Sequence, residues 1–178
     1  MTPTVEVSVQ TAIAPVPTEI TAISPAQWQI WFNQWLEKTQ PVFKLPAVNH
    51  YALTLRLCDD AQIQQLNRQY RQQDCPTDVL AFATLDNAFP DAIAPESECT
   101  EFELGDIIVS LPTAQAQAQA HDHFLNQEVI WLVSHGFLHL LGWDHPDAAQ
   151  LRQMLQQQDQ LLRQIQIAPP SWANYDKL

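Results

Sequence analysis

Residues 134–145 read SHGFLHLLGWDH, and the three histidines of this stretch carry most of the structural information in the chain. His135 and His139 are four residues apart, so on a helix they share one face, with Cβ atoms roughly 5–6 Å apart. Gly142 suits the end of that helix, because glycine readily takes the left-handed conformation found at many helix termini. The spacing therefore predicts a helix and a turn that returns His145 to the other two imidazoles.

Three converging imidazoles are typical of a Zn²⁺ site whose fourth position stays open for water. The alternatives are a closed structural site, which usually has four protein ligands and often cysteine, or hydrogen-bonded core histidines. No cysteine lies in the stretch, and Asp144 is a candidate fourth ligand or an acceptor that orients an imidazole. Imidazoles also suit nickel, copper or iron. We predict an open site for one zinc ion, held by His135, His139 and His145.

The 178 residues predict one domain spanning 1–178, with an N-terminal strand and linker over 1–25 and a tail over 168–178. No apolar stretch is long enough to span a bilayer, and the N-terminus lacks the layout of a secretory signal. Three cysteines without close pairing favour reduced thiols, as in a cytoplasm. We therefore expect a cytoplasmic protein that does not bind membranes.

The net charge of −12 argues against tight, non-specific binding of nucleic acid, which normally needs a basic surface. Five of the eight basic residues, however, fall between Lys38 and Arg71, ahead of an acidic stretch from Asp86 to Asp106. A local basic face with a few phosphate contacts is therefore compatible with the charge.

Hydrophobic periodicity predicts four strands and five helices. The expected strands are 5–9, 51–57, 79–85 and 104–110. The expected helices are 26–38 (with Trp28, Ile30, Trp31 and Trp35 on the buried face), 61–70 (capped by Asp59 and Asp60), 113–121 (capped by Thr113), 124–141 and 147–167. Connections are expected over 14–25 and 86–103, the second acidic and long. This order does not alternate regularly, so it predicts an α+β fold with a small mixed four-stranded sheet packed by several helices.

The same histidine and glycine spacing occurs in metzincin proteases, which carry a glutamate directly after the first histidine as the general base. Here that position is Gly136, which can neither accept a proton nor orient a water molecule. The sequence therefore disfavours a protease and leaves a metal site without an adjacent carboxylate.

Three blocks together resemble the YbeY family of bacterial metal-dependent endoribonucleases. They are HGFLHLLGWDH over 135–145, LNRQYR with DCPTDVLAF over 66–82, and LGDIIV over 104–109. The resemblance implies an α+β fold, a zinc ion on the three histidines and, by motif matching, a catalytic arginine at Arg71. The family usually has serine and proline where this chain has Ala81 and Ala83, so no role is transferred to that serine.

The resemblance further implies cleavage of single-stranded ribosomal RNA, in maturation of the 3′ end of 16S rRNA and in late-stage ribosome quality control. The implied partners are the small ribosomal subunit and a ribosomal protein or ribosome-associated GTPase, with no role on DNA. Two alternatives stay open. One is a zinc hydrolase of another substrate, such as a metzincin-like peptidase without its glutamate. The other is a non-catalytic ribosome-assembly factor with structural zinc.

Four further residues near these motifs have simpler expected roles. Thr77 and Asp78 follow Arg71 closely and are expected to form and cap a turn. His121 and His123 precede the main helix, and we expect them to face solvent rather than to extend the metal site.

Overall fold

The computed structural model describes residues 3–39, 45–46, 48–87 and 101–169. Its strands are β1 (Thr4–Thr11), β2 (His50–Cys58), β3 (Val79–Ala83) and β4 (Glu101–Ser110). Its helices are α1 (Thr18–Thr21), α2 (Pro25–Lys38), α3 (Asp60–Arg71), α4 (Leu111–Ala120), α5 (Leu125–Leu140) and α6 (Ala148–Gln164), with a 3-10 turn at Thr84–Asn87.

The four strands form one sheet in the order β1-β2-β4-β3. β1 pairs with β2 and β2 with β4 in parallel, whereas β3 pairs with β4 antiparallel. The predicted α+β fold with a mixed four-stranded sheet is therefore confirmed.

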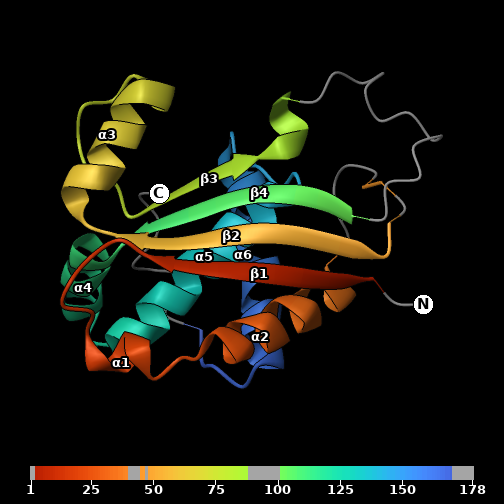
Figure 1. Cartoon of the computed structure of the whole chain (residues 1–178), viewed down its shortest axis with the longest axis horizontal. Coiled ribbons are helices and arrows are strands. Elements are labelled where there is room, and N and C mark those ends of the chain that lie inside the picture. Colours follow the sequence, from red (N-terminus) through yellow and green to blue (C-terminus); the bar gives the residue numbers. More distant parts are fainter. Residues whose placement is uncertain (1–2, 40–44, 47, 88–100, 170–178) are drawn as a thin grey trace.

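Strand β4 is buried on both faces, which explains its continuous apolar sequence. Ile107 and Val109 point into the main core between the sheet and helices α2, α5 and α6, while Ile108 points into a smaller cluster under α3. In Figure 1, α3 lies on one side of the sheet and α1, α2 and α4 lie on the other. The sheet is thus a central layer, and the longest helices stack on one of its faces.

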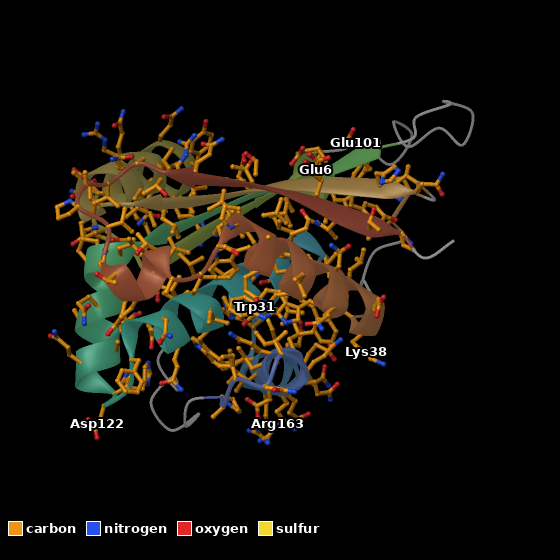
Figure 2. The ribbon with its side chains drawn as sticks, turned by 60° about the horizontal axis from the view of Figure 1, so that its bottom comes forward. Glu6, Trp31, Lys38, Glu101, Asp122 and Arg163 are labelled. Carbon is orange, nitrogen blue, oxygen red and sulfur yellow. The ribbon has the colours of Figure 1, made fainter. Side chains whose placement is uncertain are left out.

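Side chains of α2 and α6 meet beneath the sheet, in the region where Figure 2 labels Trp31. Trp28, Phe32 and Trp35 are the fully buried aromatic residues of α2, and the Trp35 indole donates a hydrogen bond to the Leu161 carbonyl of α6. The prediction that Ile30 lies on the buried face is wrong, since this side chain is 51% exposed. Phe32 takes that place, because residues 28, 32 and 35 follow the helical period.

Several helix and strand ends differ from the predicted ones. Ser110, not Thr113, caps α4, and the Thr113 hydroxyl instead donates a hydrogen bond to Asp60 at 2.7 Å. The cap on α3 is Asp59, as predicted, with its carboxylate accepting from the Gln62 amide. A further helical turn, α1, lies inside the predicted linker.

The third and fourth strands also change length relative to the prediction. β3 ends at Ala83, where the chain enters a 3-10 turn, and β4 begins at Glu101 instead of Leu104. Of the acidic loop expected over 86–103, residues 88–100 lie outside the described part of the chain, and residues 101–103 belong to β4.

Candidate metal centre

Helix α5 forms where predicted and runs through the core, with most of its sixteen residues buried. Gly136 lies where this helix packs against the sheet. A Cβ atom at this position would stand 2.8 Å from Cγ2 of Ile107 and 3.4 Å from Cγ2 of Val79. A side chain here would therefore force its neighbours to shift, because the helix lies so close to β3 and β4, and this gives glycine a structural reason next to His135.

The end of α5 turns the chain back toward its own last turns. The amide of Gly142 donates to the His139 carbonyl and the amide of Trp143 donates to the Leu138 carbonyl, which is the Schellman arrangement. Gly142 has φ of +86°, the left-handed conformation that this arrangement requires. The turn returns the chain so that His145 reaches the histidines of the helix.

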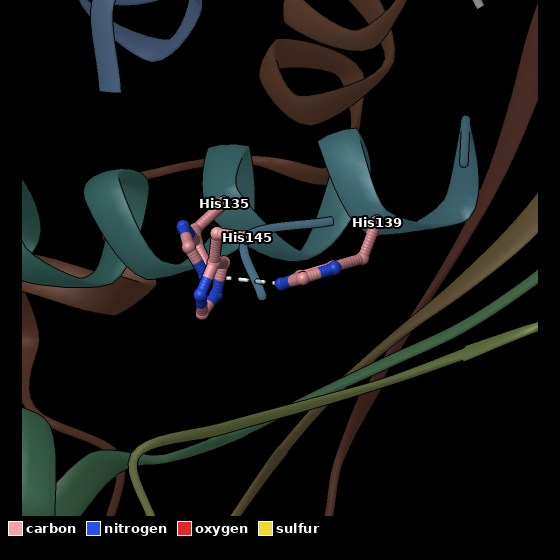
Figure 3. Close-up of side chains that lie close together, drawn as sticks. All are labelled: His135, His139 and His145. Carbon is pink, nitrogen blue, oxygen red and sulfur yellow. Dashed lines mark hydrogen bonds between the residues drawn. The ribbon is translucent and has the colours of Figure 1, made fainter. Parts of the chain in front are cut away.

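The three histidines meet at one point (Figure 3). The Nε2 atoms of His135 and His139 are 3.1 Å apart. Ring centroids are separated by 4.8 Å between His135 and His139, 5.4 Å between His135 and His145, and 5.3 Å between His139 and His145. One ligand atom from each residue lies within 4.8 Å of the others. The arrangement is a nearly regular triangle of imidazoles, which matches the donor set of a zinc site.

The environment keeps the imidazoles of His135 and His139 neutral. Burial lowers the pKa of His135 to about 3, helped by the nearby His139 and His145. Burial also lowers the pKa of His139 to about 4, with His145 and then Arg71 adding to the effect against a hydrogen bond to the Trp143 backbone. Neutral imidazole is the form that binds a metal ion, so His135 and His139 are ready to bind one at neutral pH.

Gln158 of α6 is a site residue that sequence reasoning missed. It is fully buried, and its side-chain oxygen lies 3.3 Å from Nδ1 of His135. Its amide nitrogen donates to the Trp131 carbonyl at 2.7 Å and to the Ser134 hydroxyl at 3.2 Å. Because these bonds orient the amide, its oxygen accepts the Nδ1 proton and leaves Nε2 of His135 for the metal.

The histidines line a cleft of about 180 Å³, together with side chains from α3, α5 and the segment before β3. Arg71, the last residue of α3, is exposed and lines this cleft. Its charge acts on the pKa of His139. The structure therefore brings together all four residues that the sequence singled out.

Asp78 is the carboxylate among the residues that line the cleft, and both of its oxygens accept hydrogen bonds. One oxygen accepts from the Val79 amide at 2.7 Å and from the Thr77 hydroxyl at 3.1 Å, and the other accepts from Gln117 at 2.9 Å. These bonds hold the bend at Asp78 before β3 and connect it to α4 through Gln117, and the turn and cap roles expected for Thr77 and Asp78 stay predictions. Asp144 accepts a hydrogen bond from the His145 amide at 2.8 Å and does not belong to the group of converging ligand atoms.

His121 and His123 are half-buried rather than solvent-facing, so that prediction is wrong. Their side chains are 18% and 13% exposed, and both approach the fully buried carboxylate of Glu128 in the first turn of α5. The sequence prediction considered only their place before a helix and not what the helix presents to them.

The fold and the cleft define a class: an α+β protein with three histidines converging beside an arginine in an open cleft. The model of the family described as "Endoribonuclease YbeY" matches residues 17–166. The chain belongs to this family.

Individual relatives agree with this assignment. The chain is 52% identical to "Endoribonuclease YbeY" of Nostoc sp. strain PCC 7120 over 145 residues, which cover 82% of this chain and 77% of the relative. It is 45% identical to the protein of the same name from Cyanothece sp. strain PCC 7425 over 171 residues, which cover 96% and 98%.

A solved structure shares the fold. The solution structure of TM1509 from Thermotoga maritima aligns with a TM-score of 0.53 at 19% identity, covering 95% of this chain and 91% of that one.

Proposed function

We propose that this protein is a metal-dependent endoribonuclease that cuts single-stranded ribosomal RNA. The observation that carries the proposal is the convergence of His135, His139 and His145 on one cleft that Arg71 also lines. Membership of the endoribonuclease YbeY family supports RNA as the substrate.

The proposed metal ion is zinc, held by the three histidines. Three imidazoles in an open cleft match zinc in ligand type and number and leave one position for water or substrate. When bound, zinc supplies a Lewis acid and brings the ionisation of water into the neutral range. Gln158 fixes the His135 ring for this role through the bond to Nδ1.

Arg71 is the proposed phosphate-binding residue. A guanidinium presents a rigid fork of N–H donors that fits two phosphate oxygens, and it keeps its charge at every physiological pH. From the end of α3 it reaches the same cleft as the histidines. Placed there, it orients the scissile phosphate and stabilises the negative charge that develops on its oxygens during cleavage.

The lining of the cleft argues against a peptidase. A zinc peptidase of the metzincin type needs a glutamate after the first histidine, and at Gly136 even a Cβ atom would press against Ile107. Asp78, the carboxylate among the lining residues, already accepts three hydrogen bonds from its neighbours. A cation beside the histidines, with no glutamate after the first of them, favours a phosphodiester over a peptide bond.

A purely structural zinc site is disfavoured by the same geometry. Structural sites usually enclose the ion with four protein ligands, whereas three histidines converge here and the cleft is open beside them. Asp144, the neighbouring carboxylate, instead accepts the His145 backbone amide.

The biological setting is part of the proposal. We assign the activity to maturation of the 3′ end of 16S rRNA and to late-stage ribosome quality control in the cytoplasm, on RNA and not on DNA. With a net charge of −12, the protein needs help to approach RNA, so the small ribosomal subunit with a ribosomal protein or ribosome-associated GTPase is the proposed partner. None of the helices in the described residues has the length and apolar character needed to cross a membrane.

The test is cleavage of one RNA sequence offered as a single strand and as a duplex. The zinc-loaded protein should cut the single strand internally and leave the duplex largely intact. His139→Ala controls for contaminating nuclease and should cut neither. Cleavage of both forms would contradict single-strand specificity, and equal cleavage by the variant would contradict the assignment of the site.

The proposed role in 16S rRNA maturation is tested separately, in cells. Cells depleted of the protein should accumulate 16S rRNA with an extended 3′ end, and wild-type protein but not His139→Ala should restore the mature end. A mature 3′ end in depleted cells would overturn the proposed setting while leaving the nuclease activity to the RNA assay.

A further inference from the structure

A second group of metal-ligating side chains lies at the opposite end of α5. It consists of His121, His123 and Glu128, whose ligand atoms also lie within 4.8 Å of one another. The ring centroids of the two histidines are 5.7 Å apart. Nδ1 of His121 is 3.9 Å from one oxygen of the Glu128 carboxylate, and Nε2 of His123 hydrogen-bonds to that same oxygen.

The backbone between α4 and α5 places the two histidines on the same side. His121 ends α4, and Asp122, with φ of +58°, reverses the chain. The backbone amides on both sides of Asp122 donate hydrogen bonds back to α4. The amide of His121 donates to the Gln117 carbonyl, and the amide of His123 donates to the Ala118 carbonyl. Figure 2 shows Asp122 at a corner of the molecule, so the cluster sits close to solvent. The side chains of His121 and His123 are 18% and 13% exposed. An ion can therefore reach this fixed turn.

Glu128 makes a bound cation energetically favourable. Its side chain is fully buried in the first turn of α5. A buried carboxylate is costly unless an opposite charge compensates it. A divalent ion shared by the carboxylate and the two imidazoles would supply such a charge. Two histidines and a carboxylate are a common donor set for zinc with an open position.

We propose that His121, His123 and Glu128 form a second site for a divalent transition-metal ion of the zinc class. Glu128 and His135 share a helix face seven residues apart, which is about 10 Å along the axis. Paired catalytic ions lie roughly 3.5–4 Å apart, so the two sites are separate. The second ion would tie the α4–α5 turn to the start of the helix that carries His135 and His139.

Zinc stoichiometry tests the proposal without any activity assay. The protein is stripped with a chelator and titrated with Zn²⁺ against a chromophoric competitor. Wild type should take up about two ions per chain, and both His139→Ala and the double variant His121→Gln/His123→Gln should take up about one. His50 lies outside both groups and contacts Thr4, so His50→Gln is the matched control and should keep both ions. A single ion in wild type, or an unchanged count in the double variant, would overturn the proposal.

A measurement on the unmodified chain covers the case in which the double variant does not fold. With ¹⁵N-labelled histidine, the imidazole signals of His121 and His123 should shift as the second equivalent of zinc binds, while those of His50 stay in place. If only the signals of His135, His139 and His145 respond, the second cluster is a hydrogen-bonded ion pair between imidazole and carboxylate, and the proposal is wrong.

Discussion

Nδ1 of His135 lies 3.3 Å from the side-chain oxygen of Gln158, a residue on a different helix. The Gln158 amide group cannot rotate freely, since its nitrogen donates to the Trp131 carbonyl and to the Ser134 hydroxyl. The oxygen is thereby held toward the imidazole and selects the tautomer with its proton on Nδ1. Helix α5 thus carries two of the three candidate ligands, and Gln158 of α6, packed against it, orients one of them.

Replacing Gln158 should therefore weaken metal binding. Gln158→Leu removes the acceptor for Nδ1, and loss of such a partner typically costs 10–100-fold in metal affinity. It also removes buried hydrogen bonds, at a cost of about 1–3 kcal/mol of stability. A competition titration with Zn²⁺ measures the first effect and urea unfolding the second. Gln156→Ala, on the exposed face of α6, is the control, and equal zinc affinity in both variants would contradict the assigned role.

Gly136→Ala should destabilise the fold. The added Cβ would lie 2.8 Å from Cγ2 of Ile107, a fully buried β-branched residue that has no room to move. Overpacking of this kind costs about 1–3 kcal/mol. Urea unfolding should show a lower midpoint than in Gln153→Ala, a substitution at an exposed helical position. An unchanged midpoint would mean that the helix does not approach the sheet this closely.

The metal-free protein should lose stability as the pH falls below about 6.5. The pKa values of His135 and His139 are lowered to about 3 and about 4 in the folded state, so the unfolded chain binds more protons between those values and the ordinary histidine value. Above pH 6.5 both histidines are mostly neutral in the folded and the unfolded chain, so the free energy of unfolding no longer changes with pH through them. Below it, each lowers the free energy of unfolding by up to about 1.4 kcal/mol per pH unit.

Chelator-treated protein unfolded in urea between pH 7 and pH 5 gives this slope. That range lies above the ordinary titration of carboxylates. His139→Gln removes one of the two groups, so its stability should vary less steeply with pH than that of wild type. Identical slopes for the two proteins would show that His139 is not held neutral by its surroundings.

The cysteines of the described residues should differ sharply in reactivity. Burial raises the pKa of Cys58 to about 12, with Asp59 and Asp60 adding to the effect, whereas Cys75 is exposed. Because only the thiolate reacts, Cys58 should react with Ellman's reagent more than about 100-fold more slowly than Cys75 at pH 8. A Cys99→Ser background leaves these two thiols to be compared. Comparable rates without denaturant would contradict the burial of Cys58.

Arg71→Ala should lower kcat for RNA cleavage by about 10²–10³-fold, the usual cost of removing a group that stabilises charge in the transition state. Arg71→Lys should recover only part of this loss, because an ammonium lacks the planar fork. Arg68→Ala is the matched control, since Arg68 is exposed on the same helix and does not line the cleft. A loss confined to KM in Arg71→Ala would reduce its role to substrate binding.

Local patterns predicted most of the fold. Three features were predictable: helix α5, its Schellman end at Gly142 and the buried strand β4. The spacing of apolar residues and the conformational freedom of glycine determine them within a few residues of sequence. Features that depend on contacts between distant residues were not. Thr113 is a reasonable helix cap by type, but Ser110 stands three residues earlier and Asp60 takes the Thr113 hydroxyl.

The same distinction between local patterns and distant contacts applies to the candidate site. The spacing of the histidines predicted their convergence, because a helix and one turn suffice to produce it. Gln158 could not be recognised, since it is one of many glutamines in α6 and gains its place only through the packing of α6 on α5. Glu128 did carry a signal, because a glutamate seven residues before His135 falls on the buried face of an apolar helix.

The most direct test of the central claim is cleavage of a short single-stranded RNA by protein stripped of metal and then reloaded with zinc. Activity should disappear on stripping and return on reloading, and His139→Ala should stay inactive under both conditions. Cleavage that persists after stripping, or that His139→Ala retains, would contradict the account of a metal-dependent nuclease built on His135, His139 and His145.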